Sequence, residues 1–506
     1  MSTEQITPTE RTRFGNWIPV RKATLGGLTV VGWGILLTAL ILMVLFFTRG
    51  AFGAGLIVIS AALVFELVFV LRFGGDATGE TIASRLSTAL SGVRRVDRGE
   101  ARFNSGLFSN LPADNLTGLP GLLGNLREID GTDGRGDPFT LLYDPNVQTV
   151  TAVFACNPEG TDLQQRAKID QDVAWYGNVI ASLSRDSAIA GAVTIVDSAL
   201  RSSEPLVQKI ASDIDPQAPA VARQAMMEAA QRLPERYAEL STWVTISWSV
   251  PALAGGIEDA VAEVASKLPY HVDALRDAGG GAVVTATSGM IADAVRVAYS
   301  PERSTEIASD ELRGHHNALR VTEAGPDYFD DSNRRVCLHD EVASMTALVL
   351  APPRLHITEE TLAPLFRPSE RFLRKRVVTF YRPVSAAKST ALVEQMGATA
   401  STVASAKARR TERDNRVVQH AAKLEQEVTS GAAITRFGMA VTVTFEPDTR
   451  SYREATLKLK SLLEASSLTY RFCEHDAGPA FHTTLPLGIL PWLYETQIEK
   501  VMGKVA

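Results

Sequence analysis

The sequence predicts an N-terminal transmembrane α-hairpin followed by a cytoplasmic α+β region of two domains in series. Between residues 25 and 72 the chain is almost wholly apolar, and its only charged residues there are Arg49, Glu66 and Arg72. Beyond residue 72, strand-like and helix-like patterns mix without a regular βαβ rhythm, which is typical of α+β proteins. The 506 residues also exceed the roughly 250–300 residues of a single core, so more than one domain is expected.

The apolar segment has the length of two membrane spans. A helix needs about 20 apolar residues to cross about 30 Å of hydrocarbon, and the stretches 28–47 and 52–71 both meet this requirement. Arg49 and Gly50 separate them, which favours a tight hairpin. Both stretches should be helical, because lipid offers the backbone no other hydrogen-bond partner. A cleaved signal peptide is the alternative, but the run is too long and a second span follows at once.

Basic residues give the expected orientation and location. They flank the hairpin on both sides, whereas its tip carries only Arg49. Because Lys and Arg stay on the cytoplasmic side, residues 1–24 are expected to form a cytoplasmic tail of a two-span plasma-membrane protein with both termini in the cytoplasm. Glu66 would then lie inside the second span, where a carboxylate is costly unless it is paired or protonated. It marks either an intramembrane polar site or a carboxyl group at a helix interface.

The region after the hairpin divides into a linker, 73–135, and two α+β domains, 136–300 and 301–506. The linker contains a short amphipathic helix, 81–93, followed by turn-forming Gly, Pro and Asn residues. In the first domain we expect strands at 138–143, 148–156, 189–196, 242–249 and 282–287, and helices at 162–184, 217–233, 257–267 and 289–299. In the second domain we expect strands at 344–350, 376–381, 438–445 and 468–473. We expect helices at 386–428, with a break at Gly397, and at 451–465.

Composition and motifs argue against several classes of function. The net charge of −6 gives no basic excess for wrapping nucleic acid, and the three cysteines form no CxxC pair. The sequence contains no Walker-type phosphate-binding loop, no nucleophile elbow and no HExxH zinc motif. We therefore expect a protein that is not an enzyme and has no catalytic, cofactor-binding or metal site.

Two clusters nevertheless have a binding interpretation. Cys337 and His339 share one face of a predicted strand, and Cys473 and His475 repeat their spacing. Zinc sites usually show two such pairs close in sequence, so structural residues are the favoured interpretation. The basic run Lys407–Arg416 places three arginines on one helix face. It either contacts anionic lipid or DNA, or forms a solvated face balanced by neighbouring acidic residues.

Several segments together resemble parts of bacterial conjugation systems. Arg13–Trp17 (RFGNW), followed by the apolar hairpin, resembles the PrgI-like small membrane subunit of Gram-positive conjugation systems. Asp137–Phe139, Arg374–Pro383, Arg436–Gly438 and above all Ala480–Gly488 (AFHTTLPLG) resemble the N-terminal, non-ATPase region of the CagE/TrbE/VirB family of type IV secretion proteins. The arrangement is similar to an actinobacterial integral-membrane family in which the two parts are fused.

The resemblance implies a function and partners. The chain stops at Ala506, where the family's P-loop ATPase would begin, so we expect a non-enzymatic inner-membrane scaffold or docking component of a conjugative DNA-transfer or type IV-like secretion machine. Its expected partners are the lipid bilayer and a separate P-loop ATPase, with self-association as a further expectation and without sequence-specific nucleic-acid binding. A type VII secretion core component and a membrane-tethered enzyme using the Cys337/His339 region are the alternatives.

The C-terminal block supplies the predicted partner interface. In the resembled family, the segment around Leu485, Pro486 and Gly488 leads into the ATPase. Trp492 and Tyr494 follow it and add aromatic area of the kind that dominates interface energies. These five residues are therefore expected to meet the motor. The alternative is that the two aromatic side chains cover the core of the second domain.

Overall fold

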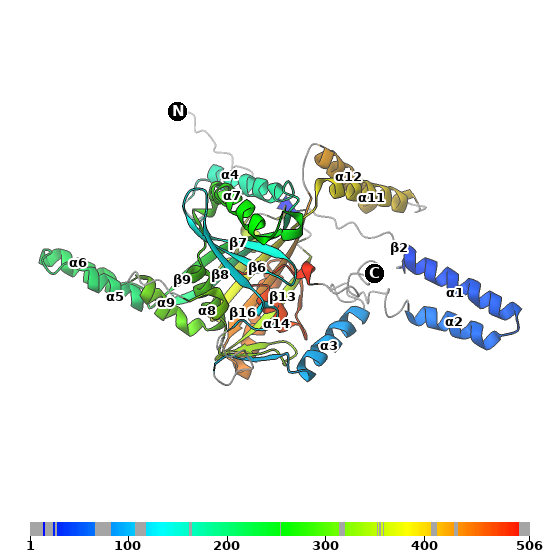
Figure 1. Cartoon of the computed structure of the whole chain (residues 1–506), viewed down its shortest axis with the longest axis horizontal. Helices are drawn as coiled ribbons and strands as arrows, with labels where there is room; N and C mark the ends of the chain where they lie inside the picture. The colour runs from blue at the N-terminus through cyan, green and yellow to red at the C-terminus, as the bar shows by residue number, and fades with distance from the viewer. Residues whose placement is uncertain are drawn as a thin grey trace, which may run out of the picture.

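The computed structural model describes residues 14–15, 24–25, 28–65, 82–106, 118–160, 164–253, 255–312, 319–351, 353, 356–357, 359–405, 412–429 and 434–494. A 13-stranded antiparallel sheet runs through the molecule (Figure 1). Its strand order is β4-β11-β12-β13-β16-β15-β8-β9-β7-β6-β5, with β10 also on β7 and β17 also on β13. The strands are β4 (Arg102–Asn104), β5 (Arg127–Thr132), β6 (Pro138–Asp144), β7 (Thr149–Asn157), β8 (Ile189–Ser202), β9 (Arg236–Ser249), β10 (Ala282–Thr285), β11 (Tyr328–Asp330), β12 (Cys337–His339), β13 (Val342–Ala351), β15 (Arg374–Pro383), β16 (Thr435–Phe445) and β17 (Thr469–Phe472).

The sheet consists of two halves with the same order of elements. The first half runs β6, β7, a helix, β8, a helical hairpin, β9, a long helix, β10 and a final helix. The second runs β12, β13, a short helix, β15, a helical hairpin, β16, a long helix, β17 and a final helix. The pairing is also the same, since β8-β9-β7-β10 in one half matches β15-β16-β13-β17 in the other. The helices are α5 (Glu204–Asp213), α6 (Ala220–Gln231), α7 (Ile257–Leu275) and α8 (Ser288–Tyr299) in the first half, and α11 (Ala386–Ser405), α12 (Glu412–Thr429), α13 (Thr449–Ala465) and α14 (Ala477–His482) in the second. The two halves are therefore structural repeats.

The repeats join edge to edge at β8 and β15. These strands pair antiparallel from Ala192 opposite Tyr381 to Ala199 opposite Arg374. Because each is the innermost strand of its own repeat, an approximate two-fold axis passes through this pair. The prediction of two α+β domains in series is thereby corrected, since one sheet crosses the expected boundary near residue 300.

One face of the sheet is covered by one long helix from each repeat. On α7, Ala260, Val264 and Leu268 are spaced four residues apart, so they lie on one stripe, and all three are buried. On α13, Leu459 and Leu463 form the equivalent stripe. Helix α4 (Arg166–Ser182) lies beside α7 (Figure 1). The opposite face is covered by α8, α14 and the chain that follows α14.

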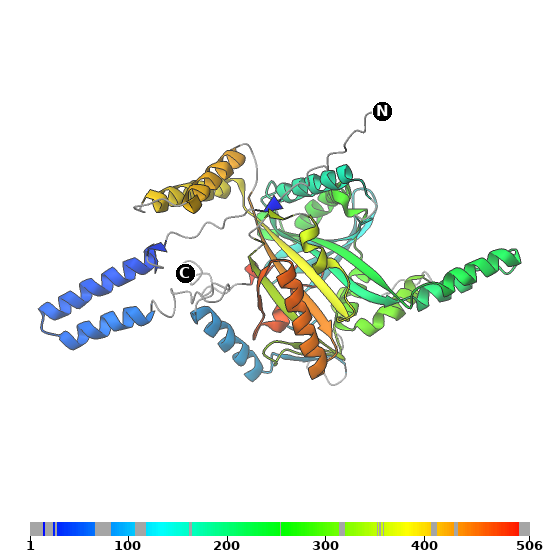
Figure 2. The same cartoon turned by 180° about the vertical axis from the view of Figure 1, so that it is seen from behind.

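Three helical hairpins extend from this body, as both views show (Figures 1 and 2). One consists of α1 (Val30–Thr48) and α2 (Phe52–Phe65). The α5–α6 hairpin, which we call the first arm, connects β8 to β9. The α11–α12 hairpin, the second arm, occupies the equivalent place between β15 and β16. Helix α3 (Ile82–Asp97) lies nearer the body, and its last turn contacts the end of β11.

The predicted transmembrane hairpin does not hold in this structure. Among the residues described, none of the helices combines the length and the apolar character that a membrane span requires. The transmembrane hairpin, and the plasma-membrane location and topology derived from it, are therefore wrong.

Candidate functional site

The candidate site is the C-terminal segment that begins with α14 and ends at the short turn Pro491–Leu493. Its first part packs on the second repeat, where α14 contacts β12 and β13. Its later part packs on the first repeat, where Gly488 lies against Thr151 of β7 and Ser247 of β9. The segment therefore crosses the sheet and ties the two repeats together.

Phe481 anchors the start of this segment. Its ring is fully buried, and its centroid lies 4.7 Å from the His339 ring and 5.3 Å from the Tyr299 ring. The guanidinium carbon of Arg376, on β15, lies 4.6 Å from the same ring centroid. A cation over an aromatic face is attracted by the ring, most strongly away from water. Phe481 thus binds α14 to the innermost strand of the second repeat.

The Leu-Pro-Leu-Gly block is an interior element. Leu485, Pro486 and Leu487 are buried, and both leucines belong to the apolar cluster beneath α8. Gly488 has a positive φ of 68°, and a Cβ atom there would lie 2.3 Å from Thr151 Cγ2. Ser247 Oγ donates a hydrogen bond of 3.3 Å to the carbonyl oxygen of Gly488. Of the five predicted interface residues, Leu485, Pro486 and Gly488 therefore lie inside the protein.

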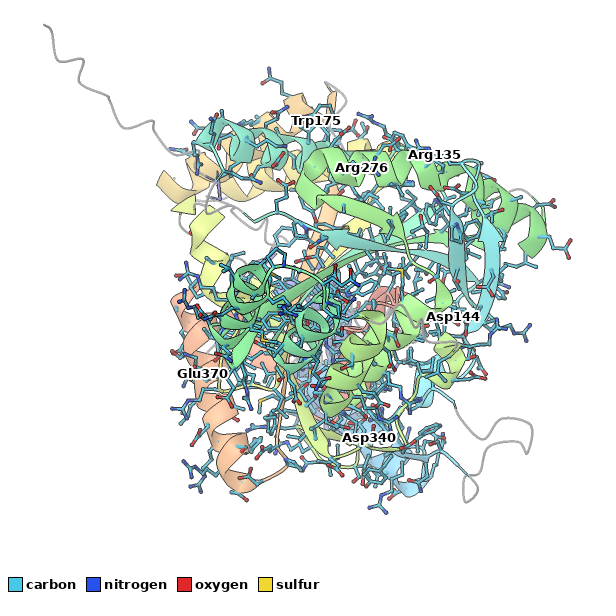
Figure 3. The ribbon with its side chains drawn as sticks, turned by 90° about the vertical axis from the view of Figure 1, so that its left-hand side faces the viewer. Arg135, Asp144, Trp175, Arg276, Asp340 and Glu370 are labelled. Carbon is cyan, nitrogen blue, oxygen red and sulfur yellow. The ribbon has the colours of Figure 1, made fainter. Side chains whose placement is uncertain are left out.

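Trp492 and Tyr494 keep part of their surface exposed. The Trp492 ring lies against Gly191, where a Cβ would be 2.5 Å from its Cζ2 atom, and 5.6 Å from the Arg382 guanidinium. The Tyr494 hydroxyl donates to the Asp144 carboxylate. Asp144 lies at the end of β6 and is labelled in Figure 3. Burial, together with this hydrogen bond, raises the pKa of Tyr494. Tyr494 covers the first repeat, whereas Trp492 packs on an apolar cluster built from β8, β15 and β16, so it covers the seam between the two repeats. The role of both side chains at a partner interface stays a prediction.

A series of buried hydrogen bonds lies beneath Phe481. His339 Nδ1 donates to the Tyr299 carbonyl at 2.6 Å, which leaves Nε2 to accept from Ser344 Oγ at 2.8 Å. Ser344 Oγ is also 2.8 Å from Thr444 Oγ1. Burial lowers the pKa of His339 to about 3, so the ring is neutral. A hydroxyl beside an imidazole can serve as a nucleophile, but both side chains are fully buried and no substrate reaches them in this structure.

His482 lies next to this series of hydrogen bonds and is also fully buried. Its ring stacks on Phe329 with a centroid separation of 4.9 Å, and neither ring nitrogen has a hydrogen-bond partner. Burial, and then the nearby His339, Arg95 and Arg376, lower its pKa to about 3. The ring is therefore a neutral packing element.

The Cys337/His339 region, with Asp331 close by in sequence, makes structural contacts. Asp331 pairs with Arg95 of α3 at 2.5 Å and accepts from the Gly478 amide at 2.8 Å, and burial raises its pKa to about 6. Cys337 is buried, and burial raises its pKa well above the ordinary value. In the part of the chain that the structure describes, no group of three or more His, Cys, Asp or Glu side chains is placed to hold a metal ion. Asp331 thus connects α3, the end of β11 and α14.

Two predicted sites cannot be placed. Glu66 lies outside the described residues. Of the basic run Lys407–Arg416, residues 407–411 lie outside them as well, and the backbone of 412–416 begins α12.

The cationic start of β15 was not predicted from the sequence. Arg374, Lys375 and Arg376 are consecutive and all buried. Arg374 Nε donates to Asp197 at 2.7 Å, and Lys375 Nζ donates to the Arg367 carbonyl. Burial lowers the pKa of Lys375 to about 8 and that of Arg376 to about 10. The run RKRVVTFY could have indicated this buried cationic group. Three charged residues at the start of an otherwise apolar strand require buried partners.

In comparisons with known proteins, no family model matches the chain, and no curated protein matches it.

Proposed function

We propose that the chain is a non-enzymatic docking component of a conjugative DNA-transfer or type IV-like secretion machine, and that it binds the machine's P-loop ATPase. The resemblance of Ala480–Gly488 and of the Arg374–Pro383 strand to the CagE/TrbE/VirB family supports the type of machine. Both segments lie at the centre of the fold, where they join the two repeats.

The observation that carries the docking role is the first arm. Val221, Met226 and Met227 on α6 are 81%, 49% and 53% exposed, and they extend from the body on a helical hairpin (Figure 2). Within α5 and α6 only Pro205 and Ala230 are buried. Exposed methionines adapt to a partner's shape, and grouped exposed apolar residues mark interaction sites. The arm therefore offers the ATPase an apolar contact surface.

A transfer assay in cells tests this function. A strain whose own copy of the gene is deleted is complemented with the parent chain, with the triple variant Val221→Asp, Met226→Asp, Met227→Asp, or with Leu457→Asp. Leu457 is the matched control because it is a 68% exposed apolar residue on α13, away from the arm. We expect the triple variant to reduce DNA transfer at least tenfold at unchanged protein level, and the control to complement fully. Normal transfer without the gene, or with the triple variant, would contradict the proposal.

A further inference from the structure

A basic cavity lies where the second arm leaves the sheet. Its volume is about 500 Å³, and it is lined by the end of β15, the start of β16, the first half of α11 and the turn between α4 and β8. Four charged side chains line it: Asp186, Arg382, Lys388 and Arg436. We call it the arm-base cavity.

Two of its arginines face one another. Arg382 and Arg436 are register partners on β15 and β16, so their side chains leave the same face of the sheet at directly opposite positions. Like charges in that position repel and destabilise the strand pair. Among the residues that the structure describes, no carboxylate forms an ion pair with Arg382, Arg436 or Lys388. The strand pair therefore places two positive charges side by side and leaves them unbalanced.

The single carboxylate of the cavity is already engaged. Asp186 accepts hydrogen bonds from Lys267 Nζ at 2.8 Å, from Trp248 Nε1 at 3.2 Å and from the Ala188 amide at 3.0 Å. Lys267 is shared between Asp186 and Glu263, each at 2.8 Å, so it balances the Asp186 charge only in part. One carboxylate against Arg382, Lys388 and Arg436 still leaves the cavity with a net positive charge.

The first repeat provides an internal comparison. At the base of the first arm, Arg201 of β8 forms an ion pair with Glu239 of the adjacent strand β9. The equivalent junction of the second repeat has two opposed arginines in place of this pair. One repeat thus neutralises the arginine at its arm base internally, while the other leaves its cations for an external anion.

The candidate segment also positions one of these cations. The Arg382 guanidinium lies 5.6 Å from the Trp492 ring centroid. Stacking on an aromatic ring holds a guanidinium in one orientation and leaves its N–H groups available. A preorganised cation binds an anion with a smaller entropic cost.

We propose that the arm-base cavity binds a small phosphorylated molecule, with a phosphate group between Arg382 and Arg436 and Lys388 beside it. Guanidinium groups match phosphate oxygens with paired, charge-assisted hydrogen bonds. The volume falls in the range of sites for small ligands, roughly 300–1,000 Å³. This site does not depend on the proposed docking function, because none of its lining residues lies on the first arm.

Calorimetric titration of the full chain at low salt and without magnesium tests the site, with pyrophosphate and adenosine diphosphate as probes. We compare the parent with Arg436→Gln and with Arg382→Gln plus Arg436→Gln. The matched control is Arg453→Gln plus Lys458→Gln, which removes the same charge from α13. We expect the parent and the control to bind both probes, the single variant to bind at least about tenfold more weakly, and the double variant to show no measurable binding.

Three outcomes would overturn the proposal. The first is that the intact chain binds neither probe. The second is that the double variant binds as tightly as the control. The third is that a 20-nucleotide DNA strand without terminal phosphates binds through these arginines while the two small probes do not. If the double variant fails to fold by circular dichroism, the comparison rests on Arg436→Gln alone, because Arg436 is an exposed residue at the start of β16.

Discussion

At the residue scale, buried neutral histidines make the folded state sensitive to acid. His339 and His482 have folded-state pKa values lowered to about 3, and burial is the largest cause for each. Below about pH 6.5 the unfolded chain takes up protons that the folded chain does not, so their contribution to stability is complete above that pH and is lost as the pH falls toward 3. Asp331 opposes this trend, because its raised pKa of about 6 favours the folded state as the pH falls from about 6 to 4.

Replacing His482 by leucine tests this account, since His482 makes no hydrogen bond that the change would remove. Urea unfolding at pH 7 and pH 5 measures the effect. Between pH 7 and pH 5, we expect the unfolding free energy of the parent to fall by about 2 kcal/mol more than that of His482→Leu. This difference is the linkage effect of one histidine that takes up a proton near pH 6.5 in the unfolded chain but not in the folded chain. An equal loss in both proteins would show that His482 is not held neutral.

Gly488 gives a second test at this scale. Gly488→Ala combines a positive φ of 68° with a clash against Thr151, so we expect it to cost about 3 kcal/mol or more of unfolding free energy. Gly99→Ala is the matched control, because Gly99 has a φ of 73° but nothing within 4 Å of a new Cβ. The control should lose only the unfolding free energy that a positive φ costs an alanine, about 1–2 kcal/mol. Equal costs in chemical denaturation would contradict the packing of the Leu-Pro-Leu-Gly block.

At the element scale, helices and strands differ in how far local pattern reveals them. The alternating run 242–249 and the four-residue spacing on α7 and α13 predicted those elements, although β9 begins earlier, at Arg236, and α7 ends later, at Leu275. The expected break at Gly397 is absent: this glycine lies within α11, and a Cβ added there would lie 4.0 Å from the Glu425 carboxylate of α12, so the helix passes through it without a clash. Helix α5 was missed, because an exposed arm has little apolar periodicity to detect.

The first arm should contribute little to folding stability. Replacing residues 205–233 by a short Gly/Ser turn leaves the pairing of β8 with β9 intact, so we expect a loss of less than about 2 kcal/mol. By contrast, Leu459→Ala on the fully buried stripe of α13 should cost about 2–5 kcal/mol. Thermal and urea unfolding measure both. An arm deletion as damaging as Leu459→Ala would mean that the arm is part of the core.

At the scale of the whole molecule, the continuous sheet makes one folding unit of two repeats. The sequence could not reveal this, because the pairing of β8 with β15 joins strands distant in the chain, and local periodicity carries no signal for such a contact. The candidate site could be predicted only in part, again because its contacts join residues distant in the chain. Its residues stood out as a motif, but only the fold shows that Leu485 and Gly488 bridge the repeats and that Arg376 supports Phe481 from below.

Thiol labelling across a urea gradient tests whether the repeats unfold together. Cys156 reports on the first repeat and Cys473 on the second, and both are buried. We expect them to become reactive at the same urea concentration, because unfolding either repeat exposes the seam of the other. Two separate midpoints would favour the independent domains that the sequence had predicted.

The docking role can be measured directly on purified proteins. Sedimentation of the full chain with the P-loop ATPase proposed as its partner reports complex formation without relying on activity in cells. We predict that the parent and Leu457→Asp bind the ATPase alike, and that Val221→Asp, Met226→Asp, Met227→Asp binds at least tenfold more weakly while unfolding at the same urea concentration. Absence of a complex with the parent chain, or equal binding by the triple variant, would contradict the docking role.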